Sequence, residues 1–583
     1  MRKILQFLVA AFVVGASAAM AQMPVIRGEP SLTPKDAMPV ARLRLAPSPS
    51  APSVRLPQVA DSEMQSIRRA NRSAKRLLIG IARPLERAGK LPTARDLAWT
   101  PVSGGYAAQL SASSPQAGAL RVAIALANVP GDVEITVFGS DAPSRLVGPV
   151  KVGSISDRTR AWWSPITDGE TQTVEFYVPA KYNPNSVQFK VTSLSHVFTT
   201  IASGLKKRTQ EIGEAGSCNI DIKCSDLLGS QAFLNARNAV AQMVFNDGNF
   251  TGLCTGELLN DSDPYRQTPW FFGANHCFDN ETLPLKSAAE MQQVANTLNT
   301  LWSFEAVACH SLSVPTYTQL TNGATFIYNN PAADVLFLRL NDMAPPGAFF
   351  SGWDANTISV GQQVITIHHP QGDLKKVSEG SVTRFSMPPV TGGGAYQFIE
   401  VRWGQGTTEG GSSGGGLWTD DGFQYNLRGA LWGGSALCTN PTGTDNFSRF
   451  DQVYPALAPY LNPTVTPAFD FSDMWWNPNE SGWGLNVIQH ASGNLFAVWY
   501  TYESDGTRTW FVMPSGSWSS SMTWSGTLYS TSGPSATMSF NPTAVQANIV
   551  GSGTLSFSDA NNGTWSYTVN GFSGSRPITR QPF

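Results

Sequence analysis

A glycine-rich turn around two adjacent serines is the feature that most constrains this chain. It comprises Gly410-Gly411-Ser412-Ser413-Gly414-Gly415-Gly416, so a serine hydroxyl lies where little side-chain bulk would block a substrate. Upstream, a histidine lies in Ala274-Asn275-His276-Cys277, and an aspartate lies between the two in Ala333-Asp334-Val335-Leu336. Glycine-rich loops are common by themselves. A histidine, an aspartate and a serine in this order predict a base, an orienting carboxylate and a nucleophile.

The N-terminus has the pattern of a secretory signal peptide. Arg2-Lys3 precedes an apolar run that ends at Ala19-Met20-Ala21, a small-x-small cleavage site. The run is too short for a retained membrane helix, and no later segment is apolar over enough residues to span a bilayer. We therefore expect a signal peptide at residues 1–21 and a secreted protein, extracellular or periplasmic.

Six cysteines lie in the middle of the chain. An even number in an exported chain predicts three disulfides, for which about fifteen connectivities are possible. A metal site is the alternative, which is disfavoured because no close Cys-x-x-Cys pair occurs. We expect neither a metal nor an organic cofactor. The cysteines are Cys218, Cys224, Cys254, Cys277, Cys309 and Cys438.

The composition changes along the chain and divides it into several modules, and we expect an all-β fold. Residues 22–212 begin with an extended stretch and one short helix over residues 61–75, and short alternating runs over about 97–200 predict a β-sandwich. Residues 213–461 are rich in short strands, with a single helix expected over 287–298. Residues 468–583 form a β-rich, aromatic module, a small barrel or sandwich, in which we expect one strand over residues 517–524.

Charge is distributed unevenly along these modules. Residues 1–212 carry 26 Lys and Arg against 14 Asp and Glu, whereas residues 213–583 carry 14 against 28. The acidic part would repel phosphates, so a nucleic-acid partner is not expected. One interpretation of this asymmetry is that the basic part docks on the acidic part through charge attraction, which salt would screen. The other is that the chain merely joins modules of different composition.

The three motifs together resemble those of the chymotrypsin/trypsin-type serine proteases. The resemblance implies a double β-barrel with His276 as base and Asp334 as the orienting carboxylate. The family pattern Gly-Asp-Ser-Gly-Gly aligns with Gly411-Ser412-Ser413-Gly414-Gly415, which selects Ser413 over Ser412 as the nucleophile. The backbone N–H groups of Gly411 and Ser413 would form the oxyanion hole.

Residues 213–460 resemble the bacterial lysyl endopeptidases in particular. Ser217-Cys218-Asn219-Ile220-Asp221 is similar to the start of their mature domain, and residues 433–438 with 445–449 are similar to their specificity-pocket segment. The resemblance implies an S1 pocket with Asp445 at its bottom and Trp432 and Gly433 beside it. It implies cleavage after lysine, with arginine as a second candidate because Trp432 stands where the family has a histidine. It also implies the disulfides Cys218–Cys438, Cys224–Cys309 and Cys254–Cys277.

Two further segments complete this interpretation. Residues 22–212 would be a propeptide of a zymogen, which the enzyme itself would remove at Lys206, Lys207 and Arg208, with Gly213 at the family's mature start. The adjacent His368 and His369 would point to opposite faces of a strand, which disfavours joint chelation, and we expect a structural role.

The C-terminal module contains eight of the chain's 17 tryptophans. The segment Asn477-Pro478-Asn479-Glu480-Ser481-Gly482-Trp483-Gly484 resembles the opening signature of a β-rich module of secreted proteobacterial proteins, which carries no function by itself. Its tryptophans would stack on polysaccharide or cell-surface material, or fill a β-barrel core. The alternative to a protease that acts on polypeptides is a catalytically inactive triad-fold protein that binds partners or surface polysaccharide through this module.

Overall fold

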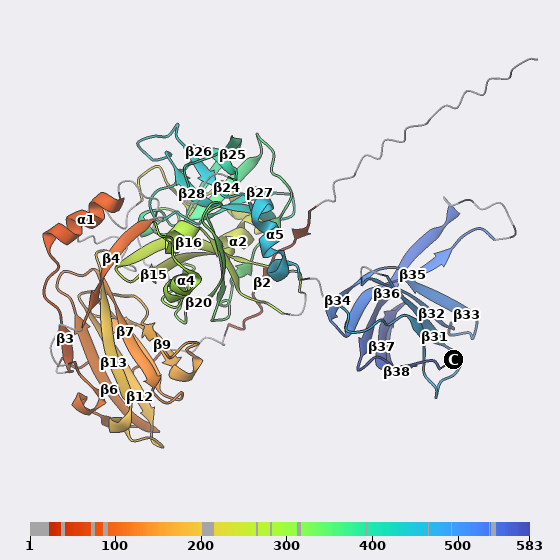
Figure 1. Cartoon of the computed structure of the whole chain (residues 1–583), viewed down its shortest axis with the longest axis horizontal. Helices are drawn as coiled ribbons and strands as arrows, with labels where there is room; N and C mark the ends of the chain where they lie inside the picture. Colours follow the sequence, from red (N-terminus) through yellow and green to blue (C-terminus); the bar gives the residue numbers. More distant parts are fainter. Residues whose placement is uncertain are drawn as a thin grey trace, which may run out of the picture. The chain divides into compact units, whose positions relative to one another are not determined.

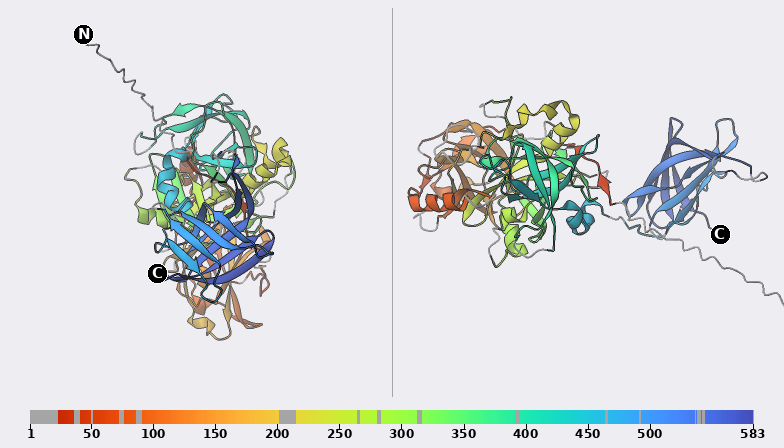
Figure 2. Two further views of the ribbon diagram at one scale, coloured as in Figure 1. Left: turned by 90° about the vertical axis from the view of Figure 1, so that its right-hand side faces the viewer. Right: turned by 90° about the horizontal axis from the view of Figure 1, so that it is seen from above.

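The computed structural model shows a mostly β protein with short helices (Figures 1 and 2). The signal-peptide segment and the basic cluster at residues 206–208 lie outside the described residues. No helix within the described part of the chain has the length and apolar character needed to cross a membrane. The described residues are 23–35, 41–49, 51–71, 76–85, 91–200, 215–263, 266–279, 283–311, 316–390, 395–463, 466–490, 493–535, 537, 541 and 544–582.

The N-terminal region is a two-sheet sandwich preceded by one helix. Helix α1 (Asp61–Asn71) begins where the sequence predicts it. One sheet has the order β3-β6-β12-β8-β9 with β5 beside β6, and β7 pairs with β13 and β10 in the other. Leu110 and Val174 of the first sheet pack in one core with Val122 and Leu194 of the second. The strands are β3 (Ser53–Arg55), β5 (Thr100–Val102), β6 (Gly105–Ser113), β7 (Ala119–Asn128), β8 (Glu134–Gly139), β9 (Ala142–Lys151), β10 (Ala161–Trp163), β12 (Thr171–Pro179) and β13 (Gln188–Val197).

Strand β4 (Leu77–Pro84) joins this sandwich to the following barrel. It pairs with β13 on one side and with β16 (Phe250–Leu259) on the other, antiparallel in both cases. The side chains of Arg76 and Asp247 form an ion pair beside this junction, and both are almost fully buried. The buried Arg121 donates from Nη2 to the carbonyl of Thr297 at 2.6 Å. Backbone pairing and buried polar contacts therefore both connect the two regions.

Two β-barrels follow. In the first, β16 pairs with β15 and β17, β17 with β21, β21 with β20, β15 with β18, and β18 with β19. In the second, the order β28-β27-β24-β25-β26-β29 is closed by the pairing of β28 with β29. This architecture confirms the predicted double barrel. The strands are β15 (Val240–Asn246), β17 (Trp270–Gly273), β18 (Asn299–Trp302), β19 (Thr318–Leu320), β20 (Ala324–Asn330), β21 (Val335–Leu340), β24 (Gln363–His368), β25 (Lys376–Ser386), β26 (Phe398–Gln405), β27 (Gly416–Asp420), β28 (Tyr425–Gly434) and β29 (Thr444–Phe447).

The barrels carry more helix than the sequence predicts. The expected helix is present as α4 (Ala288–Ala295), where Ser287 and Glu290 form a capping box. Helices α2 (Gln231–Ala239), α3 (Asn275–Phe278) and α5 (Phe450–Leu461) were not predicted. Helix α5 ends at residue 461.

The C-terminal module is a nine-stranded barrel with a tryptophan-rich core. Its strand order is β33-β32-β31-β30-β38-β37-β36-β35-β34, and β33 also pairs with β35. Trp475, Trp499, Trp524 and Trp565 fill the interior. The single strand expected over residues 517–524 is wrong, since β34 and β35 are joined there by a tight turn. The strands are β30 (Asp473–Trp476), β31 (Gly484–Gln489), β32 (Leu495–Tyr502), β33 (Arg508–Met513), β34 (Gly516–Ser520), β35 (Thr523–Ser532), β36 (Gln546–Phe557), β37 (Asn562–Val569) and β38 (Phe572–Arg580).

Candidate active site

The side chain of His276 lies between a carboxylate and a serine hydroxyl. His276 is in α3, directly after the buried strand β17, and Asp334 directly precedes β21. Asp334 is fully buried, and its Oδ1 accepts from the backbone N–H of His276 while its Oδ2 accepts from Nδ1, both at 2.9 Å. These two bonds fix the orientation of the ring and place a proton on Nδ1. Nε2 is then left to accept a proton.

Ser413 supplies the hydroxyl on the other side of the ring. Its Oγ lies 2.7 Å from Nε2 of His276. Thr255 of β16 holds the turn in place, because its N–H donates to the carbonyl of Ser413 at 2.8 Å and its Oγ1 donates to the carbonyl of Gly411 at 3.0 Å. The structure thus brings together the three predicted residues in a geometry that allows the imidazole to take the serine proton.

The hydroxyl of the neighbouring Ser412 has a different partner. Its Oγ lies 2.7 Å from Nδ1 of His368 and accepts from the backbone N–H of Glu409 at 3.1 Å. Ser412 is fully buried. The two serines of the turn therefore contact two different histidines, and only Ser413 contacts the one bonded to Asp334.

Three backbone donors on the same turn have no acceptor in the described part of the chain. These are the N–H groups of Gly410, Gly411 and Ser413, whereas the N–H groups of Ser412, Gly414 and Gly415 all have carbonyl acceptors. Gly411 has a φ of +93°, and a Cβ there would lie 2.8 Å from the carbonyl oxygen of His369. A glycine is needed at this position. Free backbone donors beside a serine hydroxyl that contacts an imidazole are suited to binding a developing oxyanion.

Asp445 lies fully buried on β29. Its Oδ2 accepts from Nε1 of Trp403 at 2.7 Å and from Oγ1 of Thr408 at 2.6 Å. On the paired strand, a Cβ at Gly434 would lie 2.5 Å from Oδ1 of Asp445. The missing side chain at Gly434 keeps space beside the carboxylate, and Thr408 connects it to the segment that leads to Ser413.

Trp432 lines a hollow of about 480 Å³ on the other face of β29. Thr444 and Asn446, the neighbours of Asp445, both face this hollow, so Asp445 points away from it because side chains alternate along a strand. Gly433 pairs with Asn446 at the end of β28. Of the residues that the sequence groups as substrate-binding, Trp432 and the Asp445 carboxylate therefore lie on opposite faces of β29.

Three disulfides brace these segments. They are the pairs that the resemblance implied: Cys218–Cys438, Cys224–Cys309 and Cys254–Cys277, the last of which ties β16 to the residue after His276. Across the described residues, one grouping of possible metal ligands occurs, Cys224, Cys309 and His310. Its two cysteines are bonded to each other and so offer no thiolate.

His369 lies behind the glycine turn as a neutral side chain. Burial, followed by the nearby Lys375 ammonium, holds the pKa of His369 well below its usual value. The ring donates from Nδ1 to the carbonyl of Asp373 at 3.0 Å, whereas the ring of His368 contacts Ser412 and Ser378. The two adjacent histidines thus have separate polar partners.

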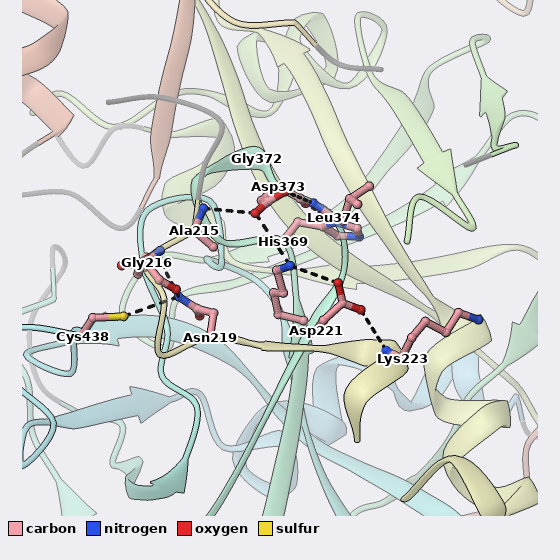
Figure 3. Close-up of polar contacts among 12 residues, drawn as sticks. Ala215, Gly216, Asn219, Asp221, Lys223, His369, Gly372, Asp373, Leu374 and Cys438 are labelled. Atoms are coloured by element: carbon pink, nitrogen blue, oxygen red, sulfur yellow. Dashed lines mark hydrogen bonds and ion pairs between the residues drawn. The ribbon is translucent and has the colours of Figure 1, made fainter. Parts of the chain in front are cut away.

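Two acidic residues near the turn, Asp373 and Glu409, bind backbone N–H groups at the start of the protease region, and the second was not predicted from the sequence. The N–H of Ala215 donates to Oδ2 of Asp373 at 3.2 Å (Figure 3). The N–H of Gly216 and Nδ2 of Asn219 both donate to Oε2 of Glu409, at 2.9 and 3.1 Å. The position of Glu409 directly before the glycine turn could have marked it as a candidate. Its partners could not be predicted, because Gly216 and Asn219 lie about 190 positions away in the chain.

Two family models match the chain. The model described as the lysyl endopeptidase C-terminal domain matches residues 212–448, and the lysyl endopeptidase N-terminal domain model matches residues 51–198. A lysyl endopeptidase of Pseudomonas aeruginosa is 35% identical over 375 residues, which cover 62% of this chain and 76% of the relative.

Solved structures give a weaker likeness. An active-form protease of M. tuberculosis is 15% identical, covers 44% of this chain and 93% of its own, and has a TM-score of 0.28. An HtrA-type protease with a tripeptide is 13% identical, covers 60% of this chain and 95% of its own, and has a TM-score of 0.27. The barrel architecture therefore rests on the strand pairing of this chain itself.

Proposed function

The chain belongs to the lysyl endopeptidase family and is a protease, and we propose that it is a secreted serine endopeptidase that cleaves after basic residues through Ser413, His276 and Asp334. The observation that carries this proposal is the position of His276, bonded to Asp334 through Nδ1 and to Ser413 through Nε2. Lysine is the expected P1 residue and arginine the second candidate.

The reaction follows from these contacts. Ser413 Oγ attacks the scissile carbonyl carbon as its proton passes to Nε2 of His276, and the resulting oxyanion is bound by the N–H groups of Gly411 and Ser413. The imidazolium then gives its proton to the leaving amine, which breaks the C–N bond and leaves an acyl-enzyme. A water molecule, deprotonated by the same imidazole, releases the acid. Asp334 stabilises the imidazolium in both steps.

Asp445 is the proposed selector of the P1 side chain. A buried carboxylate held by two neutral donors, Trp403 and Thr408, favours the approach of a cationic side chain. The absence of a side chain at Gly434 supports access to its Oδ1. Trp432 and Gly433 are the other proposed substrate-binding residues, and Trp432 lines the hollow on the other face of β29.

Residues 22–212 are proposed to be the propeptide of a zymogen. Strand β4 of this region adds to β16, the strand whose Thr255 holds the nucleophile turn. Self-cleavage after the basic cluster at residues 206–208, with trimming toward Gly213, would separate the two regions. The signal peptide at residues 1–21 would direct export, which agrees with three disulfides.

Labelling with a fluorophosphonate probe and digestion of a mixed peptide library test this function together. The wild-type protein should be labelled at Ser413, and mass spectrometry of the digest should show lysine, or lysine and arginine, at P1. The Ser413→Ala variant should fail both assays. A correctly folded wild-type protein, freed of residues 22–212, that neither reacts with the probe nor cuts the library would instead support the inactive binding protein.

A further inference from the structure

A cavity of about 210 Å³ lies in the C-terminal barrel. Its lining includes Trp499 of β32, which is only 5% exposed, and Tyr567 of β37, and the centroids of the two rings lie 4.4 Å apart. These two strands are separated by three others in the sheet order, so the contact crosses the interior of the barrel. The cavity is therefore built into the barrel, in a place where such folds commonly bind small ligands.

The rim of the cavity combines a third aromatic ring with polar groups. Trp483 donates from Nε1 to Oε2 of Glu480 at 3.1 Å, and Nε of Arg576 lies 3.3 Å from the same oxygen. Thr501 adds a hydroxyl-bearing side chain to the lining. The Glu480–Arg576 pair is close to half exposed, so it contributes little to stability. The pair places one carboxylate and one guanidinium beside the aromatic lining of the cavity.

The signature segment of this module builds the rim. It supplies both Glu480 and Trp483, and its Gly482 has a φ of +124°, a conformation that favours glycine. A Cβ at Gly484 would lie 2.8 Å from the carbonyl oxygen of Trp475. The two glycines thus allow the tight path that carries Trp483 over the cavity, which gives this segment a physical role.

We propose that this cavity binds one ring of a neutral polysaccharide. The partly exposed rings of Trp483 and Tyr567 can pack on the apolar face of a sugar ring, and the carboxylate, guanidinium and hydroxyl groups of the rim match sugar hydroxyls. The volume, equivalent to about seven waters, suits one sugar ring. A cationic ligand such as an ammonium ion would need a carboxylate that is not already paired, but Glu480 is paired with Arg576. An anionic ligand is disfavoured for the same reason, because the Arg576 guanidinium is already paired with Glu480.

Binding of soluble hexasaccharides to the full-length Ser413→Ala protein tests the proposal. Cellohexaose, chitohexaose, laminarihexaose and maltohexaose are titrated by calorimetry and by tryptophan fluorescence. At least one should bind, and Trp483→Ala should weaken that binding at least tenfold. The matched control is Trp510→Ala, since Trp510 is an exposed tryptophan of β33 outside the cavity. Its binding should equal that of the parent protein.

Variants of the rim residues show whether a loss of binding comes from a lost contact or from misfolding. Glu480→Leu and Arg576→Leu change half-exposed side chains and should each weaken binding at least fivefold with unchanged thermal unfolding. The proposal is overturned when none of the four sugars binds, when Trp510→Ala loses as much affinity as Trp483→Ala, or when choline or inorganic phosphate binds in their place. Because Ser413 is already replaced, the result is independent of whether the chain is a protease.

Discussion

The backbone N–H of Gly216 donates to Oε2 of Glu409 at 2.9 Å, although the two residues are 193 positions apart. A Cβ at Gly216 would lie 2.8 Å from Oε1 of Glu409 and 2.5 Å from Sγ of Cys438, so only glycine permits this approach. The contact joins the start of the protease region to the residue that precedes the glycine turn. It thereby links the segment next to the proposed cleavage site to the proposed oxyanion hole.

Glu409→Ala should lower kcat by roughly 10- to 100-fold with little change in KM, because charge-assisted bonds that hold the turn contribute about 1.5–3 kcal/mol each. Glu409→Gln keeps an oxygen acceptor and should restore most of the loss. The affinity of a peptide boronate, which mimics the tetrahedral species, should fall in parallel with kcat for Glu409→Ala. An equal rise in KM with kcat unchanged would mean that Glu409 acts on substrate binding instead.

Ser413→Ala should reduce kcat on the order of 10⁶-fold, because the three residues act as a unit. Ser412→Ala should stay within about tenfold of the wild type, since it removes hydrogen bonds to His368 and Glu409 and not the nucleophile. Amide hydrolysis by both purified variants decides between the serines. A dead Ser412→Ala enzyme beside an active Ser413→Ala enzyme would reverse the assignment.

Asp445→Asn should lower kcat/KM for lysine and arginine at P1 by about 100- to 1,000-fold, as expected when one partner of a buried ion pair is removed. Substrates with a neutral P1 residue should change little. The measurement is kcat/KM on matched peptides that differ only at P1, with the exposed Asp505→Asn as control. A uniform loss for every P1 residue would assign Asp445 a structural role.

Glu257 should make the folded state less stable as pH rises. The side chain is fully buried on β16, and burial raises its pKa well above the usual value. The folded state therefore keeps a proton that the unfolded state releases, so this stability is complete below the unfolded pKa and is lost as pH rises toward the folded pKa. The expected slope is about 1.4 kcal/mol per pH unit.

Urea unfolding of the Ser413→Ala protein between pH 5 and pH 8 measures this slope. Glu257→Gln should flatten it and stabilise the protein at pH 8. The matched control Glu503→Gln, at an exposed turn of the C-terminal module, should leave the slope unchanged. A slope that persists in Glu257→Gln would assign the pH dependence to another group.

Maturation should depend on the enzyme's own serine. Purified wild-type protein should have an N-terminus between Thr209 and Gly213, whereas Ser413→Ala made in a protease-free host should keep residues 22–212. N-terminal sequencing reads both results. An active wild-type enzyme that still begins at Gln22 would contradict the zymogen proposal.

Features encoded by local sequence were the ones that could be predicted. His276, Asp334 and Ser413 each lie in a recognisable short motif, and alternating apolar residues located strands such as β7 and β12. The contact of Glu409 with Gly216 was missed because it depends on tertiary folding alone. The turn between β34 and β35 was missed because Ser520-Ser521-Met522 lacks a glycine or asparagine signal.

The pairing of β4 with β16 determines what happens after the chain is cut. Hydrolysis near residues 206–213 would break one covalent bond but none of the hydrogen bonds between these strands. The released segment would then be a separate ligand, held by affinity alone and no longer by the high effective concentration of a tether. Its departure would depend on dilution, and a second cut within the freed segment would make it irreversible. Enzyme concentration would thus set what fraction of the cleaved enzyme is free of the segment.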